Sequence, residues 1–109
     1  MSVAYVIAFD VRPGRRERFL ERLTGVLDAM RHEATFRSAT LHEDPENPQR
    51  FLLHEVWSDH DDVVTVQMAR PYRRAWHAAL PDLLAADRQI GIWRPIANLR
   101  SGTPALRLG

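Results

Sequence analysis

Residues 3–11 constrain the fold of this chain more than any other segment. Large and small apolar side chains alternate there, so one face carries Val3, Tyr5, Ile7, Phe9 and Val11 and the other carries Ala4, Val6 and Ala8. A period of two is typical of a strand. Because this strand is apolar on both faces, both faces must be covered.

The periodicity of the remaining chain predicts the other elements. We expect a helix over 19–30, strands over 36–43 and 50–57, helical segments over 63–68 and 72–84, and a short strand over 90–93. Two prolines within residues 44–49 predict a long hairpin loop, and Pro81 is expected to break or restart the last helical run. The order β-α-β-β-α-β predicts an α+β, ferredoxin-like fold with a four-stranded antiparallel sheet and two helices on one face.

That architecture leaves the second face of the sheet bare. We expect a second copy of the chain to cover it, which predicts a homodimer. A length of 109 residues suits one compact domain, expected over residues 1–96. Residues 97–109 contain Gly, Pro and Ser without a clear period and predict a C-terminal tail, loose or docked on the partner subunit.

Charge and cysteine content narrow the function classes. Lys and Arg total 15, all of them Arg, against 14 Asp and Glu, and this balance argues against a nucleic-acid or membrane-surface binder. The chain has no cysteine, which excludes disulfides and thiolate chemistry. No apolar run near the N-terminus is long enough to cross a bilayer, so a cytoplasmic location is expected.

Five histidines are the first candidates for proton transfer: His32, His42, His54, His60 and His77. None of them pairs at a recognisable metal-ligand spacing, so no metal site is predicted. His32 and His60 lie at predicted helix ends, where a solvated role is the simpler interpretation. His42 and His77 are open to either a catalytic or a surface role.

The third predicted strand places a carboxylate among apolar side chains. Glu55 and Trp57 share one face with Phe51 and Leu53. A carboxylate in that setting is paired with a cation or has a raised pKa. Trp57 and Phe51 suit either the core or the wall of an aromatic-ligand site.

Large side chains recur at helical spacing in the region that follows the third predicted strand. Gln67, Met68, Tyr72 and Trp76 are one to two turns apart, a pattern typical of core that would also suit a flat aromatic pocket. Gly-rich phosphate loops and nucleophile-elbow motifs are absent from the sequence, so nucleotide, flavin and acyl-serine chemistry have no support in it.

The order and spacing of several short motifs resemble the antibiotic biosynthesis monooxygenase family of the dimeric α+β barrel proteins. The likeness covers residues 3–96. The segments that carry it are Val11-Arg12-Pro13-Gly14, Arg31-His32-Glu33, residues 41–44, residues 51–59, Ala69-Arg70-Pro71-Tyr72 and residues 78–84.

The resemblance implies a homodimer with a pocket between sheet and helices. It also implies oxidation of an aromatic phenol, anthrone or quinol by O2 without cofactor, in which the protein supplies a base, a dry pocket and orientation. Many members have His where this chain has Gln67 and Tyr72. Related haem-degrading enzymes share Trp57 but differ at Ile7 and Gln67, so haem degradation is not expected.

We therefore predict His42, His77 and Tyr72 as catalytic candidates. The predicted substrate-binding residues are Trp57, Gln67, Trp76, Phe51 and Glu55, with Trp57 as a stacking wall and Gln67 as a polar anchor. Two alternatives stay open: a polyketide cyclase-like enzyme that transfers protons in the same pocket, and a non-catalytic dimer that binds a small molecule.

Overall fold

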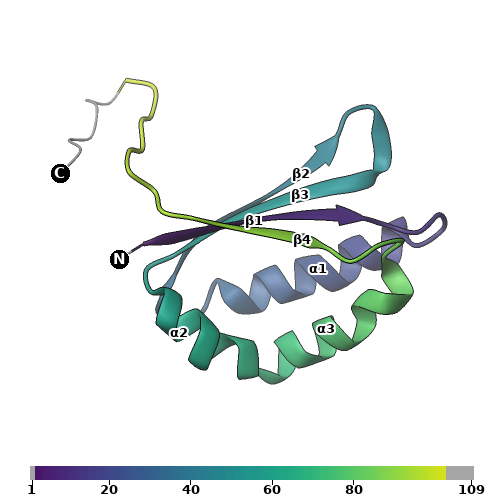
Figure 1. The fold of residues 1–109 in the computed structure, drawn as a ribbon, viewed down its shortest axis with the longest axis horizontal. Coiled ribbons are helices and arrows are strands. Elements are labelled where there is room, and N and C mark those ends of the chain that lie inside the picture. Colours follow the sequence, from purple (N-terminus) through teal and green to yellow (C-terminus); the bar gives the residue numbers. More distant parts are fainter. Residues whose placement is uncertain (1, 103–109) are drawn as a thin grey trace.

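A computed structural model describes residues 2–102. The elements in chain order are β1 (Val3–Asp10), α1 (Arg16–Met30), β2 (Phe36–Asp44), β3 (Asn47–Trp57), α2 (His60–Thr65), the short 3-10 helix η1 (Gln67–Ala69), α3 (Pro71–Leu83) and β4 (Gln89–Trp93). The four strands form one sheet in the order β2-β3-β1-β4, with every neighbouring pair antiparallel. All helices lie on one face of this sheet (Figure 1). The predicted α+β, ferredoxin-like βαββαβ fold is confirmed.

The core lies between the sheet and the helices, on the face of β1 that carries the large side chains. Phe9 of β1 contacts Phe19 of α1 and Trp76 of α3, with ring centroids 5.1 and 6.1 Å apart. Phe19 also contacts Phe51 of β3 at 5.0 Å. Aromatic contacts of this kind join the sheet to both long helices, and burying such large side chains is the main force that holds the layers together.

The predicted long loop over residues 44–49 is wrong. Asp44 pairs with Asn47, so a turn of two residues, Pro45 and Glu46, connects β2 to β3. Pro48 is part of β3. It lies beyond the end of the β1–β3 ladder, which stops at Asp10 and Arg50, and next to a register shift in the β2–β3 ladder. Its missing N–H therefore interrupts no regular run of ladder bonds.

The expectation that Pro81 breaks the helix is also wrong. α3 continues through Pro81 and ends at Leu83. A proline inside a helix removes the backbone bond to the carbonyl four residues earlier. Because the helix ends two residues later, only one such bond is lost, close to its end. Leu84 and Ala85 then bond back to the end of β1, through a bridge between Val11 and Leu84 and a bond from Ala85 N to Asp10 O of 2.8 Å.

The far face of the sheet is not covered by any element of residues 2–102 (Figure 1). Its cross-strand rows include Val6 beside His54 and Thr40, and Ala8 beside Leu52. A hollow of about 1000 Å³ lies over this face and is lined partly by residues that follow β4. The part of the predicted tail beyond residue 102 lies outside the described residues. Within the described range, no helix is long and apolar enough to span a bilayer.

Candidate functional site

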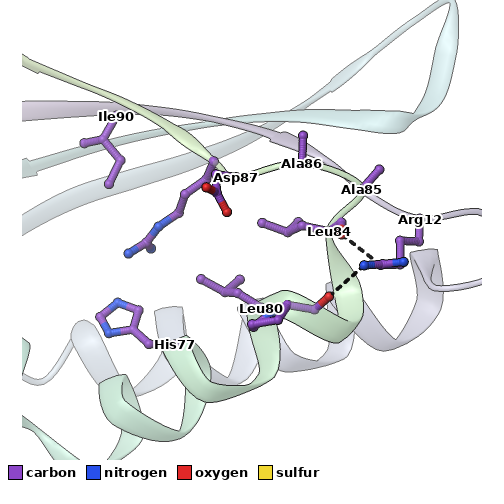
Figure 2. A pocket seen from close by; sticks show the side chains of 10 residues that line it. Arg12, His77, Leu80, Leu84, Ala85, Ala86, Asp87 and Ile90 are labelled. Atoms are coloured by element: carbon purple, nitrogen blue, oxygen red, sulfur yellow. Dashed lines mark hydrogen bonds between the residues drawn. The ribbon is translucent and has the colours of Figure 1, made fainter.

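A cavity of about 520 Å³ opens between α3 and the segment that leads into β4. Figure 2 shows His77 and Leu80 pointing into it from α3, while Ile90 faces them from β4. Its full lining comprises Arg12, His77, Leu80, Pro81, Leu84, Ala85, Ala86, Asp87, Arg88 and Ile90. A volume of this size suits a small organic ligand.

Local hydrogen bonds fix the wall of this cavity. Arg12 donates from Nε to the Leu84 carbonyl at 2.9 Å and from Nη2 to the Pro81 carbonyl at 3.1 Å. Both bonds are drawn in Figure 2. They tie the end of α3 and the following segment to the turn after β1, so the wall is held by the rigid sheet rather than by a free loop.

His77 has the electrostatics of a neutral base. Burial lowers the pKa of its imidazole, and the positive charges of Arg88 and Arg73 lower it further. No hydrogen bond to the ring forms within residues 2–102. A half-buried imidazole with a lowered pKa is neutral at physiological pH and can accept a proton from a ligand in the cavity.

Arg88 is a second cation on the cavity wall, besides Arg12. Burial and the charge of Arg73 lower the pKa of its guanidinium, and Glu55 opposes this effect. An arginine in this setting remains protonated. The cavity thus holds a neutral imidazole beside a cation that can stabilise an anion formed by proton transfer.

Glu55 lies deeper, on the helix-facing side of β3. Only 4% of its surface is exposed, and its carboxylate accepts a hydrogen bond of 3.0 Å from Trp57 Nε1. Burial raises the pKa of Glu55, although the charge of Arg73 and the Trp57 bond oppose the rise. No cation of the described chain lies within ion-pair distance of it, so a raised pKa is the outcome here rather than a salt bridge.

Arg73 is buried without an anionic partner. It is 7% exposed, and its guanidinium carbon lies 5.3 Å from the centroid of the Trp57 ring. Nη1 makes a long contact of 3.9 Å with Met68 Sδ, whereas Nε and Nη2 have no hydrogen-bond partner among the described residues. A buried guanidinium with two free donors is costly unless an anion joins it.

Tyr5 on β1 and His60 at the start of α2 form a hydrogen-bonded pair. The Tyr5 hydroxyl lies 2.6 Å from His60 Nδ1. Burial raises the pKa of Tyr5 and the charge of Glu55 raises it further, while Arg73 opposes the rise. The hydroxyl therefore keeps its proton, and it is hydrogen-bonded to the His60 ring nitrogen. His60 begins α2, whose first turn is capped by the Asp59 side chain.

Two predicted site residues, Gln67 and Tyr72, lie in a different network. The Glu33 carboxylate accepts hydrogen bonds from Gln67 Nε2 at 3.3 Å, Arg70 Nη2 at 3.1 Å and Tyr72 Oη at 3.3 Å. Gln67 Nε2 also donates to Asp62 at 3.1 Å. This network joins the segment after α1 to α2, η1 and α3, and neither residue lines the cavity beside His77.

The other predicted residues are spread through the molecule. Phe51, Trp57 and Trp76 are buried in the core and do not line the cavity. His42 lies on β2 on the far face of the sheet, where it lines a separate hollow of about 370 Å³ with Ala8 and Leu52. Of the three catalytic candidates, the structure places only His77 in the cavity between α3 and β4.

Sequence reasoning missed Arg73, Arg88 and Tyr5. Arg73 had a usable signal, because it precedes Trp76 by three residues and Leu80 by seven and so falls on the buried face of the helix. Tyr5 alternates with apolar residues on the covered face of β1. Arg88 had no signal, since it lies between helix and strand, where periodicity carries no information.

Comparison with known proteins adds independent information. The family model of the antibiotic biosynthesis monooxygenases matches residues 2–79. The curated protein named putative monooxygenase GME11364, from Pestalotiopsis microspora, is 28% identical over 93 residues, which are 84% of this chain and 78% of that protein.

Solved structures agree in fold. SnoaB, a cofactor-independent oxygenase from Streptomyces nogalater, superposes with a TM-score of 0.78 at 21% identity over 90% of this chain and 96% of its own. Rv0793 from Mycobacterium tuberculosis superposes with a TM-score of 0.79 at 20% identity over 94% of this chain and 100% of its own.

Proposed function

Because this chain belongs to the antibiotic biosynthesis monooxygenase family, we propose that it oxidises an electron-rich phenol, anthrone or quinol with O2 in the cavity beside His77. The observation that carries the proposal is the half-buried imidazole with a lowered pKa, facing the cavity next to the Arg88 cation. The names of GME11364 and SnoaB support a monooxygenase or oxygenase reaction.

The proposed reaction begins with proton transfer. His77 removes a proton from the activated methylene or hydroxyl of the substrate, and Arg88 stabilises the resulting anion. The anion donates electrons to O2, a C–O bond forms, and the peroxide takes the proton back from His77. Loss of water from the hydroperoxide leaves a carbonyl. One methylene and one O2 thus give one carbonyl and one water.

Oxygen uptake tests this proposal. We expect the purified protein to accelerate O2 consumption with an anthrone substrate in the presence of a chelator, and to transfer one atom of ¹⁸O2 to the product. His77→Ala should reduce the rate by about 10²-fold or more, in line with the loss of a general base. His32→Ala, at an exposed position after α1, is the matched control.

The product mass separates the alternatives. A product that has only lost water would indicate a cyclase. No rate above buffer with any anthrone, phenol or quinol would contradict the oxygenase, and tight binding without turnover would indicate a binding protein. A His77→Ala variant as active as the wild type would remove His77 from the mechanism.

We also propose that two chains pair through the far faces of their sheets. The support is the apolar surface left there, including Leu52, 40% exposed, and Trp93, 64% exposed. The hollow over this face has the concave shape that a partner could fill.

A further inference from the structure

The side of α3 that carries His77 also carries Arg73, one turn toward the N-terminal end of the helix. Arg73, His77 and Leu80 are spaced i, i+4 and i+7, so they share one side of the helix. His77 and Leu80 line the cavity, and Arg73 is buried one turn nearer the N-terminal end of α3. The positive charge of Arg73 contributes to the lowered pKa of both His77 and Arg88.

The groups around this site carry more positive than negative charge, because Arg12 and Asp87, which also line the cavity, carry one charge of each sign. Arg73 and Arg88 are two cations, His77 is neutral, and Glu55 is the nearby carboxyl whose charge acts on both guanidiniums. No salt bridge joins either arginine to an acidic residue of the described chain. Two Arg73 donors, Nε and Nη2, have no partner within residues 2–102.

We infer that Arg73 and Arg88 together bind an anionic group, such as a carboxylate, on the aromatic ligand of this cavity. A guanidinium presents paired N–H groups that match the two oxygens of a carboxylate, and the free donors of Arg73 are those that such a group would use. The Trp57 ring under the guanidinium holds its plane. The inference rests on the proposed function for the position of the ligand and narrows its class to acidic aromatics.

A binding experiment tests this without turnover. The probes are anthraquinone-2-carboxylate and anthraquinone-2-carboxamide, which are already oxidised and differ only in the charge of one group. We expect the wild type to bind the carboxylate at least about tenfold more tightly than the amide, as measured by calorimetry. Arg73→Met should bring this ratio close to one and leave amide affinity nearly unchanged.

Two further variants keep the result interpretable. Arg74→Met, an exposed neighbour on the same helix, should retain the wild-type ratio. Arg88→Gln should lower the ratio even if Arg73→Met fails to fold, which a thermal melt would reveal. Equal affinity of the wild type for the two probes, binding of neither, or an unchanged ratio in a folded Arg73→Met variant would overturn the inference. Oxygen uptake plays no part in these measurements, so failure of the oxygenase proposal would be seen separately.

Discussion

His77 shows how the surroundings of one residue set its chemistry. On sequence alone it is a helix histidine beside a tryptophan, open to a catalytic or a surface role. The structure places it half-buried in a cavity wall, where burial and two guanidiniums lower its pKa. Its charge state follows from burial and from these two guanidiniums, neither of which is adjacent to it in sequence.

The first prediction concerns the protonation of His77. Arg88→Gln removes a positive charge that disfavours the imidazolium, so the pKa of His77 should rise toward the ordinary value. Chemical shifts of the ring followed by NMR against pH would measure the change. Arg94→Gln, an exposed site past β4, is the control. A His77 pKa that stays fixed or falls would show that Arg88 does not act on it.

The second prediction follows from the direction of the shift in the pKa of His77, which is downward. A general base works in its neutral form, and the lowered pKa extends the neutral form of His77 to pH values below 6.5, the ordinary pKa of histidine. Turnover should therefore be constant near neutral pH and decline only as the pH falls through the lowered pKa. Measurement of kcat/KM against pH checks this. A decline that begins well above pH 6.5 would point to another base.

At the scale of elements, the features that could be predicted from the sequence and those that could not have different physical causes. Alternation and helical spacing predicted the four strands and the two long helices, because these patterns reflect burial of one face. The helical segment expected over 63–68 is instead α2, which ends at Thr65, followed by the 3-10 helix η1. The turn at Pro45 and Glu46 and the continuation of α3 through Pro81 were not predictable. Both depend on whether a missing N–H falls where a bond is needed, and that is decided by the neighbouring strand or by the distance to the helix end.

The third prediction tests the Glu33 network, which joins several elements. Glu33→Ala leaves Gln67, Arg70 and Tyr72 without a shared acceptor, so the free energy of unfolding should fall by about 1–3 kcal/mol. Urea denaturation measures this change, with Glu21→Ala at an exposed position on α1 as the control. Wild-type stability in Glu33→Ala would mean that water replaces the carboxylate at little cost.

At the scale of the whole molecule, the bare face of the sheet was expected from the two-sided apolar strand. The fourth prediction is that the wild type sediments as a dimer and that Leu52→Glu shifts it to monomer, because charge would be buried at the interface. Val64→Glu, at a 56% exposed site on α2, should remain dimeric. A wild type that is monomeric at high concentration would contradict the pairing.

The site could be predicted only in part, because it depends on how side chains from different elements pack against one another. His77 was found because histidines are few, but Trp57, Phe51 and Trp76 resemble ligand-stacking residues as much as core residues until their packing is known. The cation pair of Arg73 and Arg88 arises from the meeting of a helix face with the segment before β4, which only the folded chain brings together.

The cavity wall and the aromatic core use largely different parts of the chain. The wall is made by Arg12, one side of α3 and residues 84–90, whereas the packed aromatic rings come from β1, α1, β3 and Trp76. Randomising exposed wall positions such as Ala85, Ala86 and Ile90 would leave those rings untouched. Ligand preference in this scaffold is thus open to directed evolution at little expense in thermal tolerance.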